Sequence, residues 1–399
     1  MTKNRNNSFD VLIIIFISLQ SLGLIGGALQ PVRIFSILLL FFVFFALIKG
    51  KLKGYFYEFL VFFIWIFYGL FTLIWTPDFD AGYKEIIVIF VNSIGFFALL
   101  ALASFANNPQ ESIIKGWKML FLILLPIALV ELIADRHLPL SIQEEGNFVN
   151  MGGGLIVQRR FASVTFGNLN ALNTVLAYVI PFLFAPLLDR IPKQKRWFSI
   201  LLLLCFFYII ISNSSRGALF ALCLVSSMFI LKYTKDLKKL IGIIILVIIG
   251  CAGLLYLSPK FYEVIFLRLT EQSLSDSGRS LAMDAGISEL VKSGFFGIGA
   301  GGFMKMMESY KADILPPHNI FLEISVQYGL IVFILFMSLG FRIWKRSQEH
   351  IEERNKFIIK SGLFIFPIVG IINSGYLLNI WIWMFLASLY IFADKKLTI

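Results

Sequence analysis

Apolar runs of about 20 residues recur along most of the chain, and polar segments of varying length separate them. A helix of about 20 apolar residues is long enough to cross a hydrocarbon core of ~30 Å. We therefore expect an all-α polytopic membrane protein with about 12 transmembrane helices, in which residues 1–399 form a single integral membrane domain. The predicted spans are 11–29, 31–48, 55–75, 85–106, 116–134, 169–188, 198–213, 217–233, 239–257, 319–342, 357–372 and 376–393.

Composition supports this fold class, because 58% of the residues are hydrophobic and only 15% are charged. Soluble domains carry about 25% charged residues. Cys205, Cys223 and Cys251 all lie inside apolar runs, where packing is their expected role. No Cys or His residues stand at ligand spacing, so the sequence predicts neither a metal site nor a cofactor. The basic N-terminus and the apolar run after it are interpreted as the first membrane helix rather than a signal peptide.

The net charge of +11 follows the predicted topology. With the N-terminus in the cytoplasm, most of the 35 Lys and Arg residues fall on the inner side, including those of 49–53, 190–196 and 232–239. Such short basic connections are typical of the cytoplasmic face. Both termini are then cytoplasmic, and a nucleic-acid partner is not needed to explain the charge. Two long segments, 135–163 and 258–318, are placed on the extracytoplasmic side.

The second outer segment contains a predicted helix, Ser280 to Ser293. Met283, Ile287, Leu290 and Val291 give it an apolar face at helical spacing. Ser277 or Ser280 is the expected N-cap, and Gly294 is expected to end the helix.

A glycine-rich stretch, Gly294 to Phe303, follows this helix. It allows two interpretations. One is a flexible re-entrant turn at the membrane surface. The other is a loop whose backbone N–H groups approach a phosphate closely, because glycine has no side chain to prevent it.

Three residues are candidates for chemistry on the outer side. Arg216 lies between two apolar runs with almost no connecting loop, where a charge is unfavourable unless it is paired. Its guanidinium either extends to the lipid headgroups or binds phosphate oxygens in a bidentate way. Arg279 starts the predicted loop helix. His318 follows two prolines and precedes an apolar helix; Glu323 is five positions on, so spacing does not support a His–Glu dyad.

The other two histidines, His137 and His350, are expected to be ordinary surface residues. His137 belongs to the first outer segment, and His350 lies in a charged inner segment.

An ordered set of short motifs resembles the O-antigen polymerase and O-antigen ligase superfamily of bacterial inner-membrane glycosyltransferases. The resemblance is densest from about residue 165 to 332, whereas the first five spans match only in general character. The motifs are Asn168-Leu-Asn170, Ser214-Ser215-Arg216-Gly217-Ala218, Gly278-Arg279, Gly297-Ile-Gly-Ala-Gly-Gly-Phe303, His318-Asn319-Ile-Phe-Leu-Glu323 and Tyr328-Gly329-Leu330.

The resemblance implies a GT-C-like, metal-independent and inverting glycosyl transfer outside the cytoplasmic membrane. The implied donor is an oligosaccharide on undecaprenyl diphosphate, and the acceptor is a glycolipid hydroxyl. Arg216 and Arg279 would hold the diphosphate, and His318 would act on the acceptor. Arg159 and Arg160 are further candidates for diphosphate or headgroup contacts. Imidazole suits the role of base, since its pKa lies near neutrality.

Three functions remain open at this point. A surface-polysaccharide polymerase would extend another lipid-linked repeat unit, and is favoured. An O-antigen ligase would transfer the glycan to lipid A-core. A polytopic transporter is the third; transporters usually keep ionisable groups at mid-membrane, and the predicted spans contain few. The sugars, the linkage, the oligomeric state and the identity of any chain-length regulator are left open by the sequence.

Overall fold

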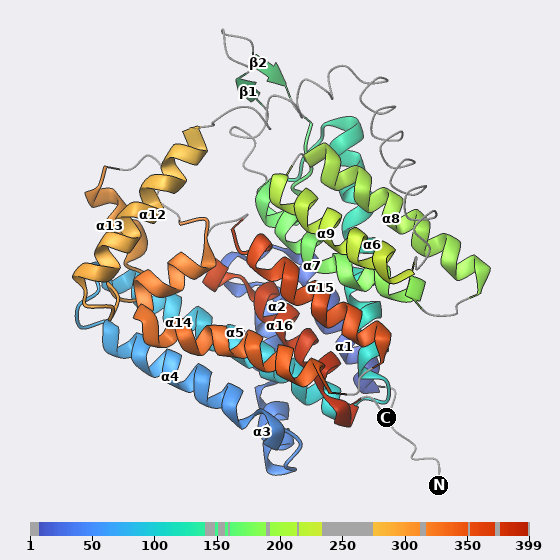
Figure 1. Ribbon diagram of the computed structural model, residues 1–399, viewed down its shortest axis with the longest axis horizontal. Helices are drawn as coiled ribbons and strands as arrows, with labels where there is room; N and C mark the ends of the chain where they lie inside the picture. The colour runs from blue at the N-terminus through green and yellow to red at the C-terminus, as the bar shows by residue number, and fades with distance from the viewer. Residues whose placement is uncertain are drawn as a thin grey trace.

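A computed structural model describes residues 8–139, 148–150, 156–158, 160–188, 192–213, 215–233, 274–311, 317–349, 352–371 and 376–397 (Figure 1). Nearly all of them are helical. The helices are α1 (Ser8–Ser18), α2 (Pro31–Leu38), α3 (Leu40–Ile48), α4 (Phe56–Thr72), α5 (Phe79–Phe105), α6 (Pro109–Ala134), α7 (Leu169–Leu188), α8 (Lys193–Asn213), α9 (Arg216–Tyr233), α12 (Leu274–Lys292), α13 (Phe303–Ser309), α14 (Ile320–Ser347), α15 (Glu353–Val369) and α16 (Ile380–Ala393).

Short elements connect these helices. The 3-10 turns are η1 (Leu19–Leu22), η2 (Gly27–Leu29), η3 (Lys53–Tyr55), η4 (Val164–Phe166), η5 (Tyr376–Leu378) and η6 (Lys395–Leu397). Two three-residue strands, β1 (Phe148–Asn150) and β2 (Ile156–Gln158), form an antiparallel pair in the first predicted outer segment.

The fold is that of a multi-pass membrane protein. Among the described residues, seven helices are long and apolar enough to cross a membrane, and Ser8–Leu22 and Ile380–Ala393 are shorter apolar helices. Each predicted span overlaps a described helix except 239–257, which lies outside the described residues. Large apolar side chains such as Phe41 and Ile48 are exposed on the outside of the bundle, as expected for a surface that meets lipid.

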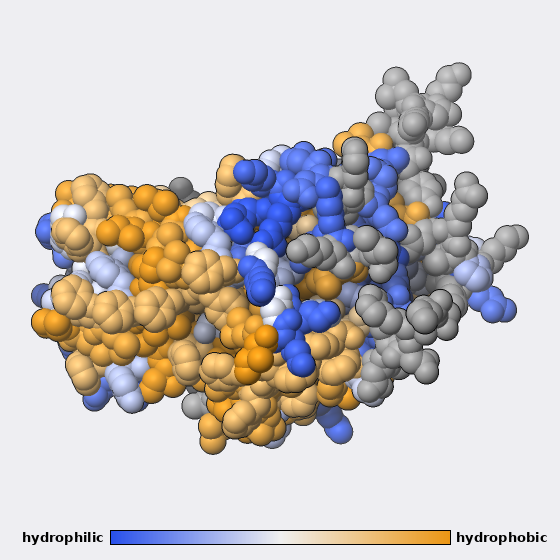
Figure 2. Space-filling model, turned by 90° about the horizontal axis from the view of Figure 1, so that it is seen from below, coloured by the Kyte–Doolittle hydropathy of each residue, from blue (hydrophilic) through white to orange (hydrophobic). Residues whose placement is uncertain are grey.

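The surface reflects this environment. Seen from below the view of Figure 1, hydrophobic residues cover broad parts of the molecule, whereas hydrophilic residues gather in one zone near the middle (Figure 2).

Two helices form the centre of the bundle. Almost every side chain of α7 and α16 is buried, which is typical of a helix enclosed on all sides. Trp117 of α6 joins them: its indole N–H donates to Ser388 Oγ (3.1 Å), and its ring stacks on Phe182 with centroids 5.3 Å apart.

The predicted first span, 11–29, is too long. The helix gives way to turns after Ser18, because Gly23, Gly26 and Gly27 adopt positive φ. A Cβ on Gly23 would lie 2.3 Å from the carbonyl oxygen of Thr165, so the chain turns where two backbones touch.

One end of the bundle is partly closed by irregular segments that are set back from the start of α5. The helix α16 has 14 residues, hence a length of about 21 Å, less than the ~30 Å of a hydrocarbon core. Asn92, thirteen residues into α5, donates its amide N–H to the carbonyl of Leu377 in η5 (3.2 Å). The turn η5 therefore lies about 20 Å below the start of α5, measured along that helix.

Buried polar side chains accompany these turns: Gln20, Ser21, Gln30, Arg33, Asn92 and Thr165. Non-helical backbone at membrane depth occurs where it is buried in protein or lines a water-filled cavity. This end of the bundle, which also carries His318, is called the His318 face below. The start of α1 and the end of α16 lie toward the opposite end (Figure 1).

Candidate functional site

His318 is held at the start of α14, as the sequence predicts. It adopts a left-handed conformation with φ of 47°, directly after the buried Pro317. The next residue, Asn319, is the N-cap, and its side-chain oxygen accepts the N–H groups of Phe321 (3.0 Å) and Leu322 (3.3 Å). The N–H of Ile320 donates to the carbonyl of Gly370 at the end of α15 (2.9 Å). The imidazole is thus fixed by a cap and by a neighbouring helix.

Arg279 is the charged group coupled to this imidazole. Burial of the ring, and then the positive charge of Arg279, lower the pKa of His318 to about 4. The ring is therefore neutral at neutral pH and able to accept a proton. Within the described part of the chain, His318 Nδ1 and Arg279 Nε are both buried and have no hydrogen-bond partner. Each has unused capacity for a ligand.

Small residues bring Arg279 toward α14. A Cβ on Gly286 would lie 3.1 Å from side-chain atoms of Leu322 and Val326, so α12 packs closely against α14 at this point. Ala282 and Ala285 are buried in the same contact. Arg279 precedes Ala282 by three positions and Gly286 by seven, which places it on the packed face of α12.

The predicted apolar face of this helix is largely wrong. Leu290 is buried, but Met283, Ile287 and Val291 are about half exposed. Helical periodicity pointed to large apolar residues as the packed face of α12, whereas the face that packs closely against α14 consists of small residues.

The predicted boundaries of this helix are only partly correct. The helix starts at Leu274, ahead of the N-caps Ser277 and Ser280 expected from the sequence. Its predicted end is confirmed, because Gly294 follows with φ of 63°.

The glycine-rich stretch contains no free row of backbone N–H groups. The N–H of Ile298 donates to Val326 O (2.8 Å), that of Gly299 to Gln327 O (3.0 Å), and that of Ala300 to Thr72 Oγ1 (3.0 Å). The remaining N–H groups from Gly294 to Gly302 also bond within the protein. Both sequence interpretations, a flexible turn and a phosphate loop, are therefore replaced by a third. The stretch is a rigid brace between α12, α14 and the end of α4.

The brace fits against a break in α14. Gly329 has φ of 70° and ψ of −178°, and the helix bends there (Figure 1). The carbonyls freed by the break accept bonds from the glycine-rich stretch, and the N–H of Leu330 donates to Phe295 O (3.0 Å). A Cβ on Gly297 would lie 2.6 Å from Gly329 N, so the two glycines meet backbone to backbone.

Replacement of Gly329 by alanine should destabilise the protein by at least about 2 kcal/mol. The new Cβ would lie 2.3 Å from Phe295 O, in a left-handed conformation that favours glycine. Thermal unfolding in detergent measures this effect. Gly340→Ala is the matched control, because Gly340 is helical and no atom lies within 4 Å of its Cβ position. Equal melting temperatures for both variants would contradict the brace.

Arg216 lies at the same height in the bundle as the end of α15, where the carbonyl of Gly370 bonds to α14. It opens α9, which packs antiparallel to α15, and the two helices are paired at their far ends by Lys232 Nζ and Glu353 Oε2 (3.0 Å). Sixteen positions separate Arg216 from Lys232, and sixteen separate Val369 from Glu353. Arg216 is therefore level with Val369, next to the Gly370 carbonyl bonded to α14. Its side chain is exposed.

The arginines of the first outer segment are placed elsewhere or lie outside the described residues. Arg160 Nη1 donates to the carbonyl of Ile133 (2.7 Å), one of the last carbonyls of α6. Arg159 lies outside the described residues, as does His350. A role for Arg159 and Arg160 in binding diphosphate stays a prediction.

His137 is buried, so its prediction as a surface residue is wrong. Its side chain is 3% exposed and stacks on Phe161, with centroids 4.6 Å apart. Nδ1 lies 3.7 Å from Glu131 Oε1, and Nε2 lies 3.4 Å from Asp135 Oδ1. Glu131 Oε2 also accepts the N–H groups of Ser163 (2.7 Å) and Val164. This cluster fixes the chain where it enters η4 and α7.

Glu85 is a buried acidic residue that sequence reasoning missed. Its Oε1 accepts the hydroxyl of Tyr328 (2.6 Å), the residue before the break in α14. The backbone of Gly301 also bonds to this carboxylate. The sequence did offer one sign of it, because Glu85 is a charged residue at the first position of the predicted span 85–106. Among the described residues, no three His, Cys, Asp or Glu side chains gather as a metal ion would require.

Comparison with known proteins places the chain near one protein family and one curated relative. Residues 200–337 match a family model described as O-antigen ligase. This range contains Arg216, Arg279, His318 and the glycine brace. The chain is also 22% identical over 338 residues to the teichuronic acid biosynthesis protein TuaE of Bacillus subtilis strain 168. The match covers 79% of this chain and 66% of that protein, so the chain spans slightly less than two thirds of the relative's length.

Proposed function

Because the chain belongs to the O-antigen ligase and polymerase superfamily, we propose that it is a surface-polysaccharide polymerase. It transfers a glycan from undecaprenyl diphosphate to a hydroxyl of another lipid-linked repeat unit. The observation that carries this proposal is the half-buried imidazole of His318, which lies close enough to Arg279 to feel its charge, while His318 Nδ1 and Arg279 Nε have no hydrogen-bond partner among the described residues.

The reaction needs a base and a site for negative charge. His318 takes the proton of the acceptor hydroxyl while its oxygen bonds to the anomeric carbon. The bond from that carbon to the diphosphate breaks, and the diphosphate leaves with the electron pair. Arg279 and Arg216 stabilise the charge that develops on the leaving oxygens. Direct displacement from the opposite side inverts the anomeric centre.

Donor binding also prepares the base. Burial of the ring, and after it the positive charge of Arg279, lower the pKa of His318 in the free protein. A bound diphosphate neutralises the charge of Arg279 and adds negative charge near the ring, so the pKa of His318 rises. The imidazole becomes a stronger base when the donor is in place.

The two comparisons support different acceptors. The relative named for teichuronic acid biosynthesis supports polymer formation. The family description, O-antigen ligase, supports transfer of the glycan to lipid A-core as a second candidate.

Purified protein incubated with lipid-linked repeat units alone tests the proposal. A ladder of products means a polymerase, and products that form only after lipid A-core is added mean a ligase. If neither substrate set gives a product, transfer itself is refuted. The ladder should disappear in His318→Asn.

We also place the His318 face on the extracytoplasmic side of the cytoplasmic membrane, with both termini in the cytoplasm. The basic connections at the opposite face support this orientation. Lys311, which is exposed on the His318 side, should react with an impermeant amine reagent in spheroplasts. Protection of Lys311 there, with labelling after lysis, would reverse the orientation.

A further inference from the structure

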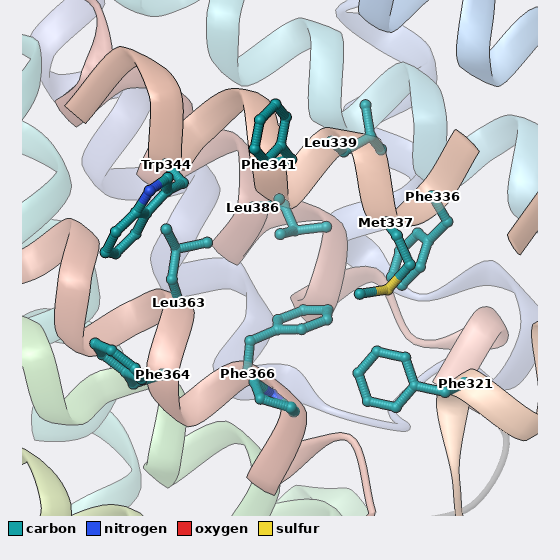
Figure 3. A pocket seen from close by; sticks show the side chains of 12 residues that line it. Phe321, Phe336, Met337, Leu339, Phe341, Trp344, Leu363, Phe364, Phe366 and Leu386 are labelled. Carbon is teal, nitrogen blue, oxygen red and sulfur yellow. The ribbon is translucent and has the colours of Figure 1, made fainter. Parts of the chain in front are cut away.

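An apolar groove of about 360 Å³ runs between α14 and α15 (Figure 3). Leu386 of α16 also contributes to its lining. Its lining is almost entirely apolar, and it includes the aromatic residues Phe321, Phe366 and Trp344. The site described above does not use this groove.

One end of the groove lies beside the candidate active site. Phe321 lines it and is three residues from His318, and its N–H is fixed by the cap on Asn319. The rings of Phe321 and Phe366 have centroids 6.5 Å apart, and those of Phe336 and Phe366 are 6.0 Å apart. From Phe336, the groove follows α14 to Trp344, a further distance of about 12 Å along the helix.

The groove opens to the membrane rather than to water. Phe341 is 65% exposed and Phe364 is 50% exposed, and both lie on helices of the bundle surface. Gly340 is also part of the lining, and no protein atom lies within 4 Å of where its Cβ would be. Hydrocarbon is the matching occupant, since an apolar space in contact with lipid tails offers a polar group no partner.

We propose that this groove holds the polyisoprenoid tail of the lipid-diphosphate donor. The inference rests on the proposed function. The donor has an anionic head that suits the unpartnered Arg279 Nε. It also has a hydrocarbon chain joined directly to that head, which must leave the site through an apolar opening. The groove begins at Phe321, beside His318, and so receives the part of the tail nearest the diphosphate.

Gly340 provides a direct test, because it lines the groove and no atom lies within 4 Å of its Cβ position, so a side chain added there enters the groove. Gly340→Phe should raise KM for the undecaprenyl donor about tenfold. It should change KM for the same glycan diphosphate on a geranyl tail by less than about threefold, since the shorter tail ends before this position. Gly340→Ala and Ile331→Phe are the controls; Ile331 is 55% exposed on the same helix and does not line the groove.

The outcomes separate this inference from the proposed function. An unchanged KM for the undecaprenyl donor in Gly340→Phe would overturn the groove assignment, while a product ladder from the unmodified protein would leave polymerase activity intact. Equal losses with both donors would also overturn it, because they would indicate distorted chemistry or a groove filled by other lipid. No product from the unmodified protein with either donor would refute the proposed function itself.

A crosslinking measurement does not depend on how well the variant folds. A donor with a diazirine in its tail should label peptides that contain Met337 or Phe341 of the unmodified protein. Unlabelled donor should displace this labelling, and ordinary phospholipid should not. Labelling that phospholipid displaces equally well would assign the groove to bulk lipid and overturn the proposal.

Discussion

Replacement of His318 by asparagine should lower the rate of glycosyl transfer by about 10²–10⁴-fold, the usual contribution of general base catalysis. Asparagine is the informative substitution, because it tolerates the left-handed φ of 47° and cannot act as a base. Single-turnover rates at saturating donor measure the loss. An unchanged melting temperature shows that the start of α14 remains folded. Turnover near that of the unmodified protein would remove His318 from the mechanism.

The pH dependence of the reaction gives an independent check on this role. In the free protein, the pKa of His318 is about 4, so the basic form is present above that pH and is lost as the pH falls through it. The acid limb of kcat/KM should therefore lie near pH 4. The acid limb of kcat should lie higher, because the bound diphosphate raises the pKa. Coincident limbs would mean that the donor does not change the charge around the imidazole.

The sequence predicted the parts of this protein that depend on one helix at a time. Apolar run length located the spans, and the bounds of α7 are those predicted, residues 169–188. Turn chemistry placed His318 at the mouth of α14 and Gly294 at the end of α12. These features follow from length and local conformation, which a single sequence reports directly.

The features that were missed depend on contacts between distant segments. Gly297 and Gly329 meet backbone to backbone across 32 positions of sequence. That contact turns a stretch expected to be flexible, or to bind phosphate, into a brace. His137 is buried because Phe161 and Glu131 enclose it. Neither partner is adjacent to it in sequence, so residue type alone gave the wrong environment.

The candidate site was predicted only in part. Its residues could be selected one by one from polarity next to apolar runs and from the resemblance of the motifs. Their arrangement could not, because Arg279 reaches His318 only through the close packing of Gly286 on α14. Spacing on α12 alone favoured a different packed face.

Replacement of Arg279 should produce the second large loss. Its Nε is buried without a partner among the described residues, and its helix is held by the brace, so the guanidinium is ready for an anion. Arg279→Gln should lower kcat/KM for the lipid-diphosphate donor by about 10²–10³-fold, as expected when a donor to a developing anion is removed. Arg279→Lys keeps the charge but loses the planar fork, and should recover only part of this activity. Arg216→Lys should fail for the same reason.

Lys292, at the other end of α12, separates a specific anion site from a general loss of positive charge. It lies on the same helix, is exposed, and pairs with Glu289 Oε1 (2.7 Å). Lys292→Gln should therefore change kcat/KM by less than about twofold, because screened surface charges contribute little. Arg279→Gln should also raise the pKa of His318 in the free protein, since one of the two causes that lower it is removed. The acid limb of kcat/KM then moves to higher pH, a shift that loss of a merely structural residue would not produce. Equal effects of the Lys292 and Arg279 substitutions, or an unmoved acid limb, would show that Arg279 acts at a distance from both donor and base.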